Sequence, residues 1–134
     1  MSAICEHRRF LRGCDAAATA VCQYCGRDFC EVHGVTLDDG QEICLRSRCQ
    51  EKRVDVERFF AYKERVAERN RSRRCGEPAC ERQAALQCSK CQGLFCGRHL
   101  EEREVEEGRG LATVRVRAVL CPYCQGRLPL WSRR

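Results

Sequence analysis

Residues 14–33 read CDAAATAVCQYCGRDFCEVH, and residues 80–99 read CERQAALQCSKCQGLFCGRH. The two stretches align without a gap and share the spacing C-x7-C-x2-C-x4-C-x2-H. The shared metal-binding residue types are Cys14, Cys22, Cys25, Cys30 and His33 in the first stretch and Cys80, Cys88, Cys91, Cys96 and His99 in the second. A lone C-x2-C is a weak signal, whereas five such residues in the same register, twice, indicate a duplicated metal-binding unit.

The flanking cysteines complete each unit. They are Cys5, Cys44 and Cys49 around the first stretch and Cys75, Cys121 and Cys124 around the second. Each unit then holds seven cysteines and one histidine, so the two units use all 14 cysteines of the chain. Four ligands make one tetrahedral zinc site. The sixteen candidate ligands therefore predict about four zinc ions, with no thiol left over.

Zinc is favoured over disulfides by the expected compartment. The N-terminus carries charged residues from Glu6 onward and lacks a signal-peptide apolar run, and no stretch of 18 apolar residues occurs. We therefore expect an intracellular, cytoplasmic protein without membrane insertion, in which thiols stay reduced and bind metal. Each half of the 134-residue chain is also so small that a hydrophobic core alone is marginal, and bound metal is then needed for stability.

The positive formal charge does not by itself predict a nucleic-acid partner. The value of +6 counts all 14 thiols as neutral. Zinc ligation deprotonates cysteine, and four zinc ions bring two positive charges each, so the net charge of the zinc-loaded chain falls to about zero.

Periodicity predicts the elements between the ligands. Residues 35–43 read as a hairpin that turns at Asp39-Gly40, and residues 112–120 read as a strand that returns from a turn near 108–110. Residues 51–70 lack Gly and Pro and predict an amphipathic helix. The face that we expect to be apolar holds Val56, Phe59, Phe60, Lys63, Val66 and Ala67.

The predicted fold is a small metal-stabilised α+β protein, in which two tandem cross-braced zinc-binding modules are joined by a helix. The expected segments are a first zinc module over 1–50, a helical linker over 51–74, a second zinc module over 75–125 and a tail over 126–134. Phe29 and Phe95 are expected to fill the two small cores.

The ligand order resembles that of cross-braced, treble-clef-type zinc fingers, namely B-box, FYVE and RING-type domains. The spacing C-x2-C-x4-C-x2-H looks most like a B-box, and the second unit, which ends in Cys121-Pro122-Tyr123-Cys124, is also somewhat FYVE-like. In such modules the first and third ligand pairs share one zinc, and the second and fourth pairs share the other. The resemblance implies the groups Cys5/Cys14/Cys30/His33, Cys22/Cys25/Cys44/Cys49, Cys75/Cys80/Cys96/His99 and Cys88/Cys91/Cys121/Cys124.

The chain departs from these families at several points. The first ligand pairs are spaced C-x8-C and C-x4-C, and His7 is an alternative to Cys5 as a ligand. The basic cluster with which FYVE fingers bind phosphoinositide is missing around Cys88. Histidine is the sixth ligand, where a RING has it fourth, so the sequence gives little support to a ubiquitin ligase-like activity.

The expected function is that of a non-enzymatic protein-interaction or adaptor module with a protein partner. Sites closed by four protein ligands leave no coordination position for catalysis. A nucleic-acid-binding or regulatory zinc finger is the alternative, resting on the basic runs 69–74 and 133–134 and on Arg115 and Arg117. The run 69–74 also reads as a solvated helix end whose cations suit the helix dipole. The acidic residues of 101–107 read as an exposed face, and Trp131 reads either as a core residue or as a partner contact.

Overall fold

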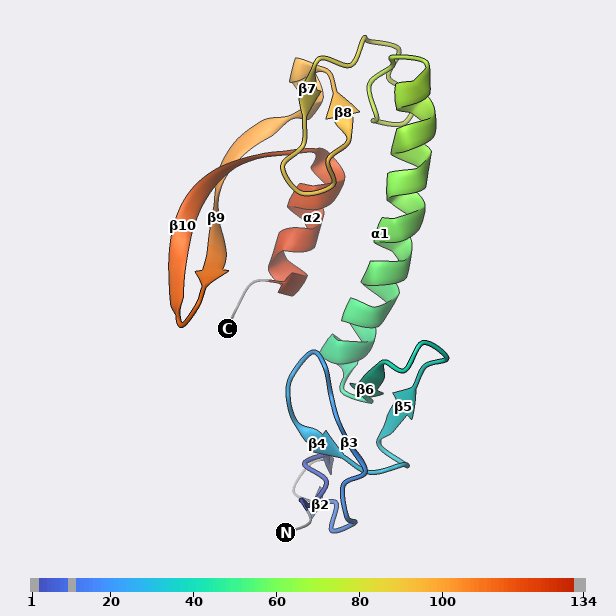
Figure 1. The fold of residues 1–134 in the computed structure, drawn as a ribbon, viewed down its shortest axis with the longest axis vertical. Helices are drawn as coiled ribbons and strands as arrows, with labels where there is room; N and C mark the ends of the chain where they lie inside the picture. The colour runs from blue at the N-terminus through green and yellow to red at the C-terminus, as the bar shows by residue number, and fades with distance from the viewer. Residues whose placement is uncertain (1–2, 10–11, 132–134) are drawn as a thin grey trace. The chain divides into compact units, whose positions relative to one another are not determined.

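The computed structural model describes residues 3–9 and 12–131, and it separates into two compact units, Met1–Val56 and Glu57–Arg134 (Figure 1). The boundary falls inside helix α1, which spans Ser47–Arg71. Arg133 and Arg134, at the end of the predicted tail, lie outside the described residues. Among the described residues, no helix combines the length and apolar character that crossing a membrane requires.

The first unit consists of three short antiparallel hairpins and the start of α1. The hairpins are β1–β2 (Arg8–Arg9, Arg12–Gly13), β3–β4 (Ala20–Val21, Asp28–Phe29) and β5–β6 (Gly34–Thr36, Glu42–Cys44). The predicted hairpin over 35–43 is thus confirmed as β5–β6, with Val35 opposite Ile43. Its turn holds Gly40 at φ +87°, a value that glycine adopts without steric cost.

The second unit contains the rest of α1, the hairpin β7–β8 (Leu86–Gln87, Leu94–Phe95), the 3-10 turn η1 (Gly97–His99), the hairpin β9–β10 (Glu101–Arg109, Ala112–Leu120) and helix α2 (Pro122–Trp131). Strand β10 is the strand predicted over 112–120. The chain turns beside Gly110, which has φ +61°.

The long hairpin β9–β10 has one face that is apolar on β10 and mixed on β9, and one charged face. Val105 lies opposite Val116 and is buried, as is Ala118 further along the same face. On the other face the exposed acidic run faces arginines, with ion pairs of 3.7 Å between Glu102 and Arg117 and 3.9 Å between Glu104 and Arg115. The acidic residues on this face are therefore part of a cross-strand charge ladder, which contributes little stability at an exposed surface.

The sequence repeat is also a backbone repeat. The amide of Cys22 donates to the carbonyl of Arg27 at 2.9 Å, and the amide of Cys88 donates to the carbonyl of Gly93 at 2.9 Å. The same correspondence holds between His33 and Cys30 (3.1 Å) and between His99 and Cys96 (3.1 Å). Equal ligand spacing thus produces the same local hydrogen bonding in both units.

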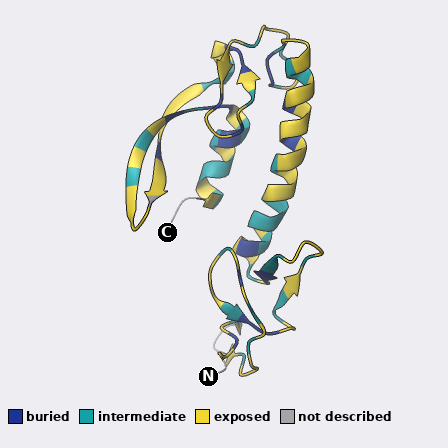
Figure 2. Cartoon of the chain, viewed as in Figure 1, coloured by how far each residue is buried: buried dark blue, intermediate teal, exposed yellow. Residues whose placement is uncertain are grey.

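Each unit has its own small core (Figure 2). In the first, Phe29 and Ile43 are buried among cysteines. In the second, Phe95 is fully buried together with Tyr62 and Val66 from α1. The predicted roles of the two phenylalanines agree with these positions.

Helix α1 has a different buried face from the predicted one. Phe60 is 63% exposed, whereas Tyr62, which the predicted face omitted, is 4% exposed. The inward positions are Phe59, Tyr62 and Val66, at the three- and four-residue spacing of one helical face. From Glu57 onward the helix is therefore part of the second core and not a free linker.

Helix α2 is the second difference, because residues 126–131 of the expected tail are helical. Gly126 and Pro129 lie inside the helix, and both residue types disfavour helix in a sequence-based prediction. Cys124 is buried in the first turn and Leu128 packs against the core, so tertiary contacts outweigh those propensities.

Candidate metal centres

The structure brings the sixteen predicted ligands together in four groups of four. In each group the ligand atoms lie within 4.8 Å of one another. The groups are Cys5/Cys14/Cys30/His33, Cys22/Cys25/Cys44/Cys49, Cys75/Cys80/Cys96/His99 and Cys88/Cys91/Cys121/Cys124. Within each unit, ligand pairs alternate between the two groups along the chain, which is the cross-braced order.

The sulfur–sulfur distances fit zinc. With Zn–S bonds of about 2.3 Å at tetrahedral angles, neighbouring sulfurs are about 3.8 Å apart. The Sγ atoms of Cys25 and Cys44 are 3.8 Å apart, those of Cys14 and Cys30 and of Cys80 and Cys96 are 3.9 Å apart, and those of Cys91 and Cys121 are 4.0 Å apart. A disulfide would need about 2.05 Å, and all fourteen cysteines, each in the described part of the chain, are free of disulfides.

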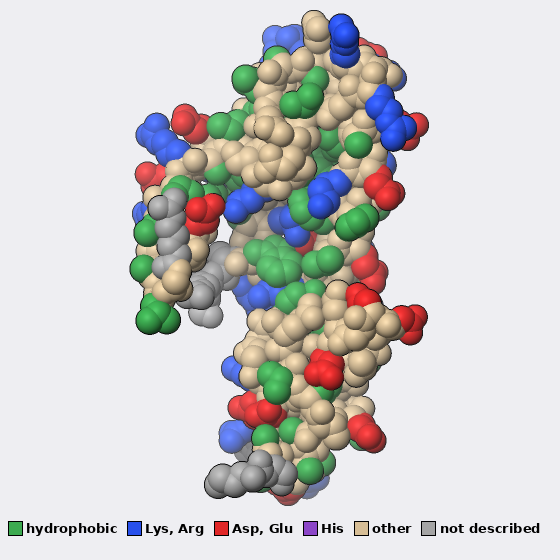
Figure 3. Space-filling view, in the orientation of Figure 1, with side chains coloured by type: hydrophobic (Ala, Val, Ile, Leu, Met, Phe, Trp, Pro, Cys, Tyr) green, Lys and Arg blue, Asp and Glu red, His purple; other side chains and the backbone are tan. Residues whose placement is uncertain are grey.

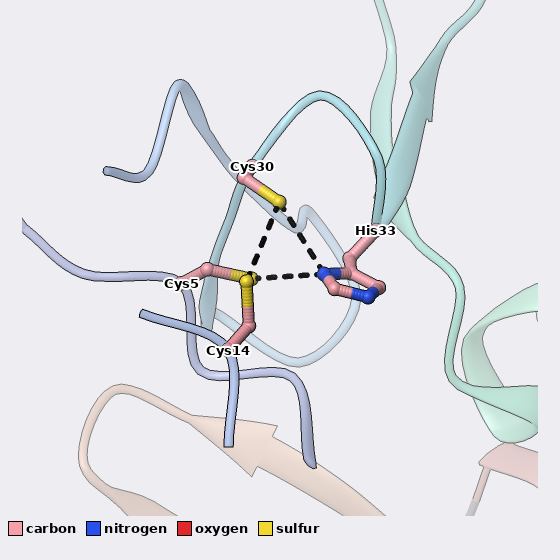
Figure 4. A group of neighbouring side chains, drawn as sticks. All are labelled: Cys5, Cys14, Cys30 and His33. Carbon is pink, nitrogen blue, oxygen red and sulfur yellow. Dashed lines mark hydrogen bonds between the residues drawn. The ribbon is translucent and has the colours of Figure 1, made fainter. Parts of the chain in front are cut away.

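The two histidines present Nδ1 to their groups. Figure 4 shows the first group, in which the Nδ1 atom of His33 lies 3.3 Å from the Sγ atom of Cys30 and 3.6 Å from that of Cys5. In the second unit Nδ1 of His99 lies 3.3 Å from Sγ of Cys96 and 3.5 Å from Sγ of Cys75. Tetrahedral zinc bonds of about 2.3 Å to sulfur and 2.0–2.1 Å to nitrogen place those atoms about 3.6 Å apart. The groups therefore fit four zinc ions per chain, in structural sites.

Backbone amides near the ligand turns favour the thiolate, which is the form that binds metal. Burial raises the pKa of Cys30, but hydrogen bonds from the amides of Val32 and His33, together with contacts to the side chains of Cys5 and His33, outweigh it and lower that pKa to about 6. In the fourth group the amide of Cys121 donates to Sγ of Cys88 at 3.4 Å. The turns thus direct the positive ends of amide dipoles at the ligand sulfurs.

Two side chains contact the ligands from outside the groups. The hydroxyl of Tyr62 lies 3.1 Å from Sγ of Cys121, and burial followed by this contact raises the pKa of Tyr62 well above its usual range. Nη1 of Arg46 donates to Sγ of Cys44 at 3.5 Å, while Nη2 donates to the carbonyl of Glu6 at 2.6 Å. Such outer contacts orient ligands and tune metal affinity.

The sequence analysis predicted neither of these two contacts. Cys44 and Cys121 occupy the same place in the repeat, and each receives one donor, although the donors come from different positions of the chain. Only the spacing of Tyr62 from Phe59 and Val66 could have indicated that Tyr62 points inward. No pattern in the sequence signals Arg46.

His7 is close to the first group but not in it. The group contains Cys5, and the ring of His7 stacks on the ring of His33 with centroids 4.1 Å apart and planes 10° apart. Between the two candidate ligands, the structure therefore favours Cys5.

Two arginines of the basic run 69–74 make contacts within the protein. Nε of Arg69 donates to the carbonyl of Cys75 at 2.8 Å, and Nη2 of Arg69 donates to the carbonyl of Cys80. Arg74 forms an exposed ion pair with Glu81 at 3.5 Å. Arg69 thus binds the backbone of the loop at Cys75 and Cys80, which are two ligands of the third group.

Trp131 ends α2 and is 37% exposed. The guanidinium of Arg127 lies over its ring, 5.8 Å from the centroid. The side chain is therefore neither a fully buried core residue nor a freely projecting one.

Comparison with known proteins gives no relative: no family model, curated protein or solved structure matches the chain.

Proposed function

We propose that the chain is a non-enzymatic adaptor protein, in which four structural zinc ions shape two protein-interaction modules. The observation that carries this proposal is the closure of the groups. Each one offers four protein ligands, so a tetrahedral zinc ion has no position for water or substrate. Catalytic zinc keeps such a position open, and all fourteen cysteines belong to the groups, so no cysteine outside a metal site is left to act as a catalytic nucleophile on a substrate.

The ligand order supports a B-box-like kind of module. Pairs alternate between two groups, and the central spacing C-x2-C-x4-C-x2-H is that of the resemblance described above. In this proposal the zinc ions hold each unit folded in place of a large hydrophobic core. The surface of each unit then serves to bind a partner.

Charge supports a protein partner over nucleic acid. Acidic and basic side chains are interspersed on the face that Figure 3 shows. In the basic run 69–74, Arg69 is bound to backbone carbonyls and Arg74 is paired with Glu81. Arg71 and Arg73 are therefore the exposed cations of the run outside these contacts. A phosphate-binding surface needs clustered cations that are available to the ligand.

The test is affinity capture of the zinc-loaded chain from its own cells, compared with Cys30→Ser, which removes a ligand of the first unit, and Cys91→Ser, which removes one of the second. We expect a defined set of proteins that is lost with one of the two variants. Recovery of nucleic acid in place of protein would favour the alternative function. Recovery of neither, with turnover of a substrate by the zinc-loaded chain, would refute the adaptor.

A further inference from the structure

The two all-cysteine groups differ in the exposure of their cysteines. Cys25 is the one exposed residue among the fourteen cysteines, all of which lie in the described part of the chain. Its three partners, Cys22, Cys44 and Cys49, are buried. In the corresponding group of the second unit all four cysteines are buried.

The difference follows from what covers the ligand turn. In the second unit the turn 88–91 lies under α1: a Cβ atom added at Gly93 would come within 2.4 Å of Val66, and Tyr62 contacts Cys121. In the first unit Cys25 occupies the place of Cys91 in the repeat, and it is exposed; the one side chain from outside the group that is recorded against its Sγ atom is Arg46, with Nη1 at 4.0 Å. Cys25 is therefore accessible to solutes, whereas Cys91 is only 7% exposed.

We propose that the group Cys22/Cys25/Cys44/Cys49 is the oxidant-sensitive zinc site of this chain, and that Cys25 is the sulfur that a peroxide attacks. Susceptibility of cysteine to oxidation follows thiolate character and exposure. All four ligands of each all-cysteine group are thiolates when zinc is bound, so exposure is what separates the two groups. This modification site is independent of the adaptor function proposed above.

The reaction balances with hydrogen peroxide as the oxidant. The Cys25 thiolate attacks one peroxide oxygen, the O–O bond breaks, and hydroxide leaves as the sulfur becomes a sulfenic acid. A neighbouring thiolate then attacks that sulfur and expels a second hydroxide, which forms a disulfide. Two thiolates lose two electrons, peroxide gains them, and two protons from solvent convert the hydroxides to water. The disulfide would leave two of the four protein ligands to hold a zinc ion at this group, too few to retain it.

Cys44 is the thiolate placed to complete the disulfide. Its Sγ atom lies 3.8 Å from that of Cys25. Nη1 of Arg46 lies 3.5 Å from Sγ of Cys44 and 4.0 Å from Sγ of Cys25, so its positive charge lies beside both sulfurs. The mixed Cys/His groups give no comparable contrast between the units, because their less buried ligands, Cys14 and Cys80, are both half-buried.

The test uses the full zinc-loaded chain treated with limiting hydrogen peroxide. Released zinc is followed with a chromogenic chelator, and the oxidised cysteines are mapped by differential alkylation and peptide mass spectrometry. We expect the first equivalent of zinc to appear together with a Cys25–Cys44 disulfide, while Cys88, Cys91, Cys121 and Cys124 stay reduced. Release of the first zinc with Cys25 still reduced, or with oxidation of the fourth group first, would overturn the proposal.

Matched variants sharpen the result. Cys25→His keeps four ligands but removes the exposed thiol, so the early release of zinc should be lost. Lys90→His introduces a histidine at an exposed position of the equivalent turn that is not a ligand, and it should leave the early release unchanged. Early release that persists in Cys25→His contradicts the proposal. If Cys25→His is purified with fewer zinc ions than the wild-type chain, the test rests on the wild-type chain alone. The proposal then stands or falls on whether Cys25 is oxidised when the first zinc ion is released.

Discussion

At the scale of single residues, the ligand positions depend on short turns that the sequence encodes directly. The amides that follow Cys30 lower the pKa of its thiol, and His33 presents Nδ1 from three residues further on. Because these relations are local, spacing alone indicated the ligand turns. The contact of Tyr62 with a ligand sulfur is not local, since Tyr62 lies 59 residues before Cys121. Arg46 lies two residues from Cys44, but no residue pattern marks it as a donor to that sulfur.

The hydroxyl of Tyr62 gives the first prediction. Tyr62→Phe removes the donor 3.1 Å from Sγ of Cys121 and keeps the buried ring. We expect the zinc affinity of the fourth group to fall about tenfold, the lower end of the effect of outer contacts on metal sites. Competition with a chelator of known affinity measures the change.

Phe60→Ala is the matched control for that measurement, because Phe60 lies on the same helix and is 63% exposed. Its zinc affinity should equal that of the wild-type chain. Equal affinities for Tyr62→Phe and Phe60→Ala would show that the hydroxyl does not tune the site.

At the scale of elements, hairpins were easier to predict than the packing of helices. The Asp39-Gly40 turn and the alternation over 112–120 are local signals, and both hairpins are present. The sequence also predicts a helix near 51–70, but two aromatic residues in a row, Phe59 and Phe60, left its inward face ambiguous. Helix α2 could not be predicted because it depends on Cys124 and on the core beneath Leu128.

The inward face of α1 leads to a stability prediction. Val66 is 2% exposed and packs against Phe95 and the two close glycines, Gly76 and Gly93. Val66→Ala removes two buried methyl groups and should lower the free energy of unfolding of the second unit by about 2 kcal/mol. Fluorescence of Trp131, the single tryptophan, follows this unit during denaturation.

Ala67→Gly would be a poor control for Val66→Ala because it also changes helix propensity, by about 1 kcal/mol. Phe60→Ala is again the better one, since its side chain is exposed on the same helix. An unchanged unfolding midpoint for Val66→Ala would mean that α1 is a linker after all and does not contribute to the second core.

At the scale of the whole molecule, the account depends on two units that each hold their own metals. The repeat and the count of sixteen ligands indicated this from sequence alone, because closed tetrahedral sites must use ligands in fours. The boundary between the units was harder to place. It falls at Val56, inside the helix, because Tyr62 and Val66 belong to the second core.

Independence of the units can be tested with one ligand. Cys91→Ser breaks the fourth group, so we expect the second unit to lose zinc and become sensitive to protease. The first unit should keep two zinc ions, because all eight of its ligands lie within Met1–Val56. Limited proteolysis with mass spectrometry measures both effects, and loss of all four metals would show a single cooperative unit.

The zinc content of the chain tests the central claim most directly. Native mass spectrometry of the purified protein, compared with its mass under denaturing conditions, counts the bound ions and shows whether the cysteines are reduced. The four groups predict four zinc ions per chain with all 14 cysteines reduced. A chain that carries two zinc ions or fewer, with disulfides mapped among the same cysteines, would contradict the account.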